Sequence, residues 1–151
     1  MTLTTDINQE RRLTARVEKQ WRICSRASFP RRCDIDRVKF GNDWQYCFMV
    51  DLSDSILESR FSYVGTGLKE EFGQLILDRQ RIGEIAAGSL LELAAKAIQN
   101  VNEKKLPVAT SGKAVHEGEE ILYRAALLPL SESGLIIDGV LGAIGYRAVV
   151  G

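Results

Sequence analysis

The stretch FSYVGTGLKE, residues 61–70, has the strand, glycine turn and helix order of a phosphate-binding loop. Such loops hold the phosphates of a nucleotide with backbone N–H groups. A dinucleotide fingerprint, however, needs a third small residue at the position of Glu70, and a second parallel strand ending in an acidic residue about 20 positions later. Both features are missing, as is the Walker pattern. We therefore interpret Gly65 and Gly67 as turning the chain from a strand into a helix.

The other reactive side chains do not form a recognisable catalytic group. Asp51, Asp54 and Glu58 gather around a predicted turn, and the single histidine, His116, lies in the turn-like sequence HEGE. A nucleophile needs an adjacent base, and the sequence places no nucleophile near His116. We expect His116 to be a solvated turn residue.

The cysteines indicate free thiols. Cys24, Cys33 and Cys47 form no CxxC pair, and their number is odd. Without a secretion signal, this pattern favours a reducing compartment, so we expect a cytoplasmic protein. A structural zinc ion needs about four ligands, which argues against a metal site.

The length of 151 residues and the 45% hydrophobic content fit one domain with its own core. No apolar run reaches the roughly 18–20 residues that a membrane span needs. Net charge is zero, yet residues 11–39 contain ten Lys/Arg and three acidic residues. A solvated helix face is the simpler interpretation of this basic segment; a nucleic-acid patch or a surface for an acidic partner is the alternative.

Hydrophobic periodicity predicts a helix over residues 7–27. Leu13, Val17, Trp21 and Cys24 form one narrow apolar stripe on it. The stripe must pack against its own domain or against a second copy of the chain. Residues 34–43 are expected to be a polar connector with one short turn.

The remaining order is two strands, several helices and three strands. Residues 46–52 and 60–64 are predicted to pair as a hairpin, with Phe61 and Tyr63 on one face. A short helix over 68–72 and a longer one over 82–102 follow. Runs at 108–115, 121–130 and 135–150, separated by polar turns, predict an antiparallel meander. This blocked order predicts an α+β domain with an antiparallel sheet.

Several short stretches resemble PAS domains, and within them short bacterial proteins, mostly alphaproteobacterial, that contain little more than one such domain. They are Trp21 followed by Pro30-Arg31-Arg32-Cys33-Asp34-Ile35-Asp36, the strand Phe48-Met49-Val50-Asp51, the run Arg60–Thr66, and the closing strand pair at 123–130 and 135–147. The chain departs from the family pattern at Arg37, where proline is frequent, and around Phe72-Gly73. The resemblance covers about residues 12–148.

The resemblance implies a five-stranded antiparallel sheet covered by helices on one face, with an N-terminal flanking helix. It divides the chain into an amphipathic helix, residues 1–28, and a PAS-like domain, residues 29–151. PAS domains commonly bind a small molecule between sheet and helices, dimerise through flanking helices and relay signals. The resemblance therefore predicts a homodimer with the stripe Leu13, Val17, Trp21 and Cys24 as its surface.

The cofactor is not identified by the sequence. Photoactive flavin chemistry in PAS domains needs a reactive cysteine after the second strand, and residues 48–151 contain none. Haem held by a histidine on the long helix is equally disfavoured. The candidate pocket consists of Arg60, Phe61, Tyr63, Phe72, Leu91, Ala94, Ile98, Tyr123 and Arg124. A filled core with both arginines in water is the alternative.

The sequence thus favours a sensory or regulatory domain without catalytic output, which acts through small-molecule binding, through contact with an unidentified signalling protein, or both. Two alternatives stay open. One is a small enzyme with a cavity beside the sheet; the other is a nucleic-acid binder using the basic segment, which lacks interleaved aromatic residues and a helix-turn-helix pair.

Overall fold

A computed structural model describes residues 7–25, 28–72, 79–85 and 90–149. The helices and strands, in chain order, are α1 (Ile7–Cys24), α2 (Arg37–Phe40), β1 (Cys47–Asp51), β2 (Arg60–Val64), α3 (Thr66–Phe72), α4 (Leu90–Lys96), α5 (Ile98–Lys104), β3 (Val108–His116), β4 (Glu119–Leu130) and β5 (Gly139–Ala148). Short 3₁₀ turns cover Arg32–Asp34, Gly41–Tyr46, Ile56–Glu58 and Ile82–Glu84.

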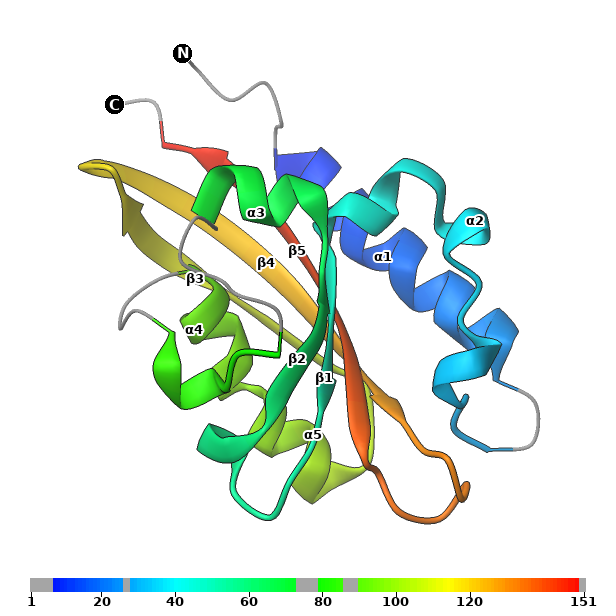
Figure 1. Ribbon diagram of the computed structural model, residues 1–151. Coiled ribbons are helices and arrows are strands. Elements are labelled where there is room, and N and C mark those ends of the chain that lie inside the picture. Colours follow the sequence, from blue (N-terminus) through cyan, green and yellow to red (C-terminus); the bar gives the residue numbers. More distant parts are fainter. Residues whose placement is uncertain (1–6, 26–27, 73–78, 86–89, 150–151) are drawn as a thin grey trace.

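The five strands form one antiparallel sheet in the order β2-β1-β5-β4-β3. The predicted hairpin is β1–β2, and the predicted meander is β3–β4–β5. The strand that comes last in the chain, β5, occupies the middle of the sheet and joins these two units (Figure 1). The α+β class and the five-stranded antiparallel sheet are therefore confirmed.

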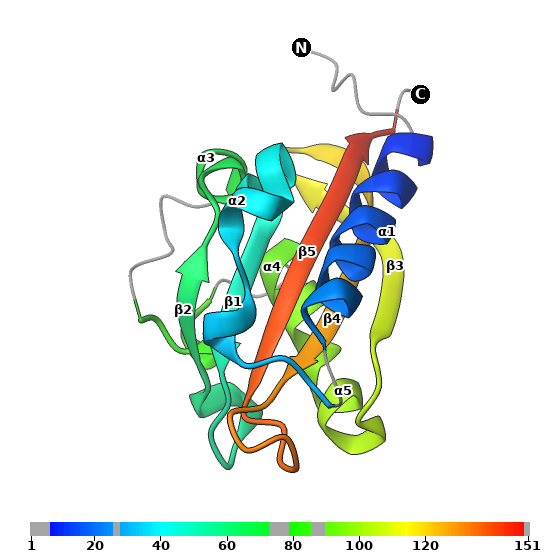
Figure 2. The same ribbon diagram turned by 90° about the vertical axis from the view of Figure 1, so that its right-hand side faces the viewer.

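Helices cover both faces of this sheet. Figure 2 shows α1 and α2 in front of it, with α4 and α5 behind. Alternate side chains of the central strands point to opposite faces, and each face therefore has its own core. The core on the face covered by α4 and α5 is called the helix-side core. It comprises Phe48, Val50, Phe61, Val64, Leu68, Ile82, Ala94, Ile98, Val101, Ala114, Ile121, Tyr123, Ala125, Leu127, Val140, Ile144 and Tyr146. The second is the α1-side core, which comprises Leu13, Val17, Trp21, Phe40, Cys47, Leu128, Leu130, Leu141 and Ala143.

The apolar stripe of α1 packs against the sheet of its own chain. Leu13, Val17 and Trp21 are buried on β4 and β5, and Cys24 is half-buried. The indole Nε1–H of Trp21 donates to the carbonyl of Pro129 over 2.9 Å. The prediction of a dimer surface at this stripe is corrected by this packing, because side chains already buried within one chain are not free for a second copy.

Three local predictions also differ from the structure. The segment at 34–43 is more ordered than a connector: Asp36 caps α2 by accepting from the N–H of Val38 over 3.1 Å. The long helix expected over 82–102 is divided into a 3₁₀ turn, α4 and α5. Strand β5 begins at Gly139, because Ser131 and Ser133 hold residues 131–136 in a hydrogen-bonded loop.

Candidate functional site

Phe61 and Tyr63 do not share a face of the sheet. Strand β2 shifts register against β1: Val50 pairs with Phe61, but the adjacent Met49 pairs with Tyr63. This β-bulge adds one residue to β2 and reverses the alternation beyond it. Phe61 consequently lies in the helix-side core, whereas Tyr63 packs beside the α1-side core. The prediction of a common pocket floor is therefore wrong, because it assumed unbroken period-two alternation.

The remaining apolar residues of the candidate pocket that the structure describes do meet. Phe61, Ala94, Ile98 and Tyr123 are all buried in the helix-side core. Phe61 contacts Phe48 edge-on, with ring centroids 5.8 Å apart. The side chains of two further predicted pocket residues, Phe72 and Leu91, lie outside the described part of the chain.

Neither candidate arginine enters the helix-side core. Arg60 is exposed and donates from its guanidinium to the carbonyl of Arg79 over 2.9 Å. Arg124 lies on β4 between Tyr123 and Ala125, which both point into the helix-side core, so strand alternation turns Arg124 toward α1. The prediction that Arg60 and Arg124 supply charged donors to the pocket is therefore wrong. Arg60 lies at the surface, and Arg124 lies on the opposite face of the sheet.

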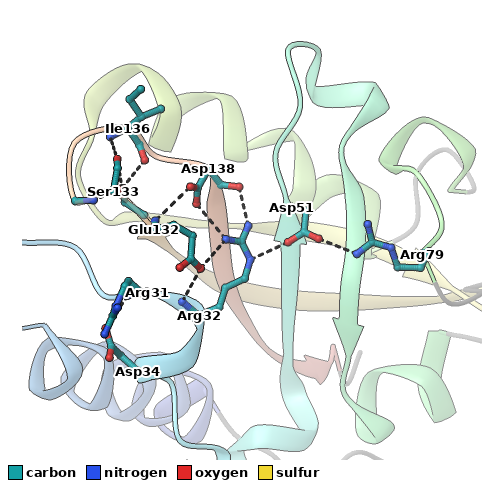
Figure 3. Close-up of polar contacts among 11 residues, drawn as sticks. Arg31, Arg32, Asp34, Asp51, Arg79, Glu132, Ser133, Ile136 and Asp138 are labelled. Carbon is teal, nitrogen blue, oxygen red and sulfur yellow. Dashed lines mark hydrogen bonds and ion pairs between the residues drawn. The ribbon is translucent and has the colours of Figure 1, made fainter.

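Polar side chains concentrate instead at the end of β1 and the start of β5, around Arg32 (Figure 3). The Arg32 guanidinium donates to Asp51 at 2.8 Å, to Glu132 at 3.2 Å and to Asp138 at 3.1 Å. It also donates to the backbone carbonyl of Asp138 at 2.8 Å. The second oxygen of Asp51 accepts from Arg79 at 2.7 Å. We call these five side chains the Arg32 network.

The Arg32 network joins four separate segments of the chain, because Glu132 and Asp138 both lie in the loop between β4 and β5. Burial by itself lowers the pKa of the Arg32 guanidinium, but the surrounding carboxylates outweigh this effect and raise the pKa above its ordinary value. Arg32 therefore stays charged, and its planar fork can satisfy several acceptors at once. Sequence reasoning did not single out this cluster. The available signal was that Arg32 and Asp51 both fall in stretches that carried the PAS resemblance.

Comparison with known proteins gives structural neighbours only: no family model and no curated protein matches the chain. One neighbour is the light-state LOV structure of the blue-light photoreceptor Aureochrome1, at 15% identity, with 70% of this chain and 82% of that chain covered and a TM-score of 0.45. Another is the PAS domain of BvgS from Bordetella pertussis, at 13% identity, 70% and 76% coverage and a TM-score of 0.45. A fungal LOV photoreceptor matches at 13% identity over 87% of this chain and 86% of its own, with a TM-score of 0.43.

The sheet itself has the five antiparallel strands that the resemblance implies, with α4 and α5 over one face and the flanking N-terminal helix α1 over the other. The fold is PAS-like. The PAS-like assignment comes from the strand order of this chain, and its chemistry must likewise be read from its own residues. In this PAS-like fold the flanking helix α1 covers the sheet face opposite α4 and α5 (Figure 2).

The glycine motif marks a close approach within the PAS-like fold. A Cβ atom on Gly65 would collide with the backbone carbonyl of Gln45, and one on Gly67 would lie 2.7 Å from the Tyr46 ring. The N–H of Gly65 also donates to the carbonyl of Cys47 over 2.8 Å. These glycines therefore let the start of α3 lie directly against the 3₁₀ turn Gly41–Tyr46.

The cysteines and His116 lie away from the helix-side core. Cys47 belongs to the α1-side core, and burial raises the pKa of its thiol far above the ordinary value. Cys33 is exposed and Cys24 is half-buried. His116 is the last residue of the edge strand β3 and is half-buried, and the turn begins at Glu117, so the expectation of a solvated turn residue is not met. Across the described residues, no three His, Cys, Asp or Glu side chains are placed to hold a metal ion.

The basic segment is partly neutralised by nearby carboxylates. Its ion pairs are Arg16–Asp43 at 2.7 Å, Arg22–Glu18 at 3.3 Å, Arg31–Asp34 at 3.5 Å and the Arg32 network. Arginines held this way offer less positive potential to a phosphate backbone. This pairing favours the simpler interpretation, a solvated helix face. Within the described part of the chain, no helix is long and apolar enough to span a membrane.

Proposed function

We propose that this chain is a sensory or regulatory PAS-like domain, without catalytic output, whose helix-side core responds to a small molecule and whose response is passed to a protein partner through α1. The observation that supports the proposal most directly is the shared sheet. Strands β1, β4 and β5 each contribute side chains to the helix-side core and to the α1-side core. A change beneath α4 and α5 therefore acts on the residues against which α1 packs.

The helix-side core and the α1-side core are connected through adjacent residues at two places. On β1, Phe48 packs in the helix-side core, and its neighbour Cys47 packs in the α1-side core. On β5, Ile144 packs in the helix-side core, and its neighbour Ala143 packs in the α1-side core. Because protein interiors are close-packed, a ligand that displaces Phe48 or Ile144 must move the strand and hence its α1-side neighbours. Coupling of this kind requires a sheet that carries both cores.

The outward face of α1 and the neighbouring α2 are the surfaces we propose for the partner. Arg12, Lys19 and Ile23 are exposed on α1, and Ile23 exposes 59% of its surface although it is apolar. A mixed basic and apolar surface suits a protein with acidic residues around an apolar contact. A homodimer also remains part of the proposal, on a surface other than the buried stripe.

The alternatives have less support. For an enzyme, two of the three acidic residues noted in the sequence are engaged elsewhere: Asp51 is held by Arg32 and Arg79, and Glu58 pairs with Arg81 at 2.9 Å. His116 lies on β3, separated from β1 by two strands. For a nucleic-acid binder, the paired arginines of α1 leave a weakened basic surface. Retention on a DNA column that falls steeply with salt would favour that alternative.

The coupling can be tested by introducing a cavity in the helix-side core and observing α1. Ile98→Ala removes a fully buried side chain of α5, and the indole N–H of Trp21 serves as the reporter on the other face. We expect the Trp21 indole signal in a two-dimensional NMR spectrum to move in Ile98→Ala. The matched control, Gln99→Ala, changes an exposed neighbour on the same helix and should leave it in place. An unmoved Trp21 signal in a folded Ile98→Ala protein would contradict the proposed coupling.

Ligand binding needs a separate measurement. Native mass spectrometry of the purified protein should show a retained small molecule, and Ala94→Leu, which adds volume inside the helix-side core, should lose it. The same spectrum gives the oligomeric state. A native mass spectrum that shows no bound small molecule would contradict the proposed ligand site and would indicate a packed core.

A further inference from the structure

We propose that a cavity beside Trp44 and Tyr63, on the sheet face opposite the helix-side core, is a second ligand site, which binds a small aromatic carboxylate. The cavity measures about 470 Å³. Sites for small organic ligands have volumes of about 300–1,000 Å³. Besides Gly41, its walls are Arg37, Asn42, Trp44, Gln45, Tyr63 and Thr66.

The aromatic wall is held rigidly. The rings of Trp44 and Tyr63 stack with centroids 4.7 Å apart and an interplanar angle of 17°. The Tyr63 hydroxyl donates to the carbonyl of Trp44 over 3.1 Å. The Phe40 ring also contacts the indole, in a tilted arrangement with centroids 5.3 Å apart. Both stacked rings are only half-buried, so a planar apolar group can pack against them without displacing the core.

The bulge in β2 is what creates this wall. Without the extra residue, strand alternation would turn Tyr63 into the helix-side core with Phe61, and Trp44 would lose the ring on which it stacks. Bulges often re-aim a side chain next to a functional site. Gly65, which directly precedes α3, contributes as well, because it allows the backbone of Trp44 and Gln45 to lie directly against the start of that helix.

The charge of the cavity comes from Arg37. Its guanidinium is exposed, and no hydrogen bond or ion pair involves it among the described residues, in contrast to Arg16, Arg31 and Arg32. It lies close enough to Tyr63 for its charge to oppose the rise that burial causes in the pKa of that hydroxyl.

Among the residues that the structure describes, no carboxylate lines the cavity to neutralise Arg37. The two nearest acids along the chain are engaged: Asp36 accepts from the N–H of Val38, and Asp43 pairs with Arg16. A cation without a partner beside an aromatic stack favours a ligand with a planar ring and a carboxylate, since the guanidinium can bind the carboxylate through two parallel N–H donors. Asn42, Gln45 and Thr66 add neutral polar groups that can orient the ligand.

Benzoate is a suitable probe, and the chain supplies its own internal control. It has two tryptophans: Trp44 lines the cavity, whereas Trp21 is buried with its indole N–H on Pro129. In ¹⁵N NMR spectra, with Trp44→Phe used for assignment, benzoate should move the Trp44 indole signal saturably and leave that of Trp21 in place. A ligand of this size should bind with a Kd of about 1 mM.

Two matched comparisons test the role of charge. Arg37→Gln should weaken benzoate binding about tenfold, because it removes a charge-assisted contact. Lys39→Gln removes a charge from the same helix at an exposed position that does not line the cavity, and it should leave the affinity unchanged. Benzamide, which has the same shape without the charge, should bind at least about tenfold more weakly than benzoate.

Several results would overturn the proposal. They are the absence of a saturable Trp44 shift up to about 20 mM benzoate, equal shifts of both indole signals, equal affinity for benzamide, or an affinity unaffected by Arg37→Gln. Movement of the Ile98 methyl signals with an unmoved Trp44 would place benzoate in the helix-side core and would equally exclude this site.

Discussion

The Nε–H of Arg32 donates to the Asp51 carboxylate over 2.8 Å, which ties the segment after α1 to the end of β1. The two residues are 19 positions apart, and each belongs to a separate stretch that resembles the PAS family. Their contact connects the segment that follows α1 to the end of the sheet at which β5 begins. We therefore expect loss of this contact to lower the stability of the fold.

Arg32→Gln should lower the free energy of unfolding by about 2 kcal/mol, because it leaves the Asp138 carboxylate without the Arg32 cation and leaves Asp51 with Arg79 alone. The Arg32 side chain is 26% exposed, so solvent screening keeps the loss below that of a fully buried pair. Arg31→Gln is the control: Arg31 is 55% exposed and pairs with Asp34 at 3.5 Å, so its loss should be clearly smaller than that of Arg32→Gln. Urea unfolding measures both, and equal losses would contradict the assigned role of the Arg32 network.

Gly142→Ala should destabilise the centre of the sheet by about 2–3 kcal/mol, because a methyl group there collides with the Phe48 ring. The two residues are directly paired across β1 and β5. The double variant with Phe48→Leu should recover part of the loss, since the smaller side chain can move aside. A double-mutant cycle from urea unfolding gives the coupling. Strict additivity would mean that the ring does not cover Gly142.

Gly65→Ala should cost more stability than Gly67→Ala, about 3 against about 1 kcal/mol. The added methyl at 65 meets the backbone carbonyls of Gln45 and Trp44, which cannot rotate away. At 67 it meets the Tyr46 ring, which can. Thermal unfolding of the two variants tests the order. The reverse order would mean that the first glycine serves the turn and not the close approach.

Cys47 should make stability depend on alkaline pH. Burial raises the pKa of its thiol in the folded chain, so folding favours the protonated form. This contribution is complete below the ordinary thiol pKa of about 8.5 and is lost as pH rises above it, by at most about 1.4 kcal/mol per pH unit. Cys47→Ala should flatten the pH dependence of urea unfolding between about pH 8.5 and 10, whereas Cys33→Ala should not.

Alkylation provides a second measurement for the same thiol. Iodoacetamide should modify the exposed Cys33 in the folded protein, and Cys47 only after unfolding. Mass spectrometry of the digested protein distinguishes the two positions. Rapid modification of Cys47 in the folded state would contradict its burial.

The periodic elements of the fold could be predicted from the sequence because they follow local rules. The stripe Leu13, Val17 and Trp21 specified α1, and alternating runs bounded by polar turns specified β3 and β4. The blocked order of strands and helices gave the antiparallel sheet. What occupies each face could not be assigned in this way: the stripe was equally consistent with a second copy, and only tertiary packing places it on β4 and β5.

The candidate site was predicted less completely, because one register shift decides it. Period-two alternation placed Tyr63 with Phe61, and the bulge opposite Met49 and Val50 separates them. The unpaired residue is Ser62, and a single serine within an alternating strand does not by itself predict a bulge. Arg124 shows the converse case: alternation from Tyr123 and Ala125 would have placed it toward α1 correctly. The Arg32 network required long-range contacts, which single-sequence periodicity does not contain.

The position of β5 has a consequence for the order in which the chain can fold. The β4 and β5 residues that cover the α1 stripe lie more than a hundred positions later in the chain. The hairpin β1–β2 likewise has no hydrogen-bonded strand connection to the β3–β4 pair until residues 139–148 enter between them. During synthesis, Leu13, Val17 and Trp21 are therefore made long before their packing surface exists. Such late, non-local closure slows folding and exposes apolar surface in the interval. A nascent chain stopped before residue 139 should accordingly bind a chaperone through α1, and the completed chain should release it.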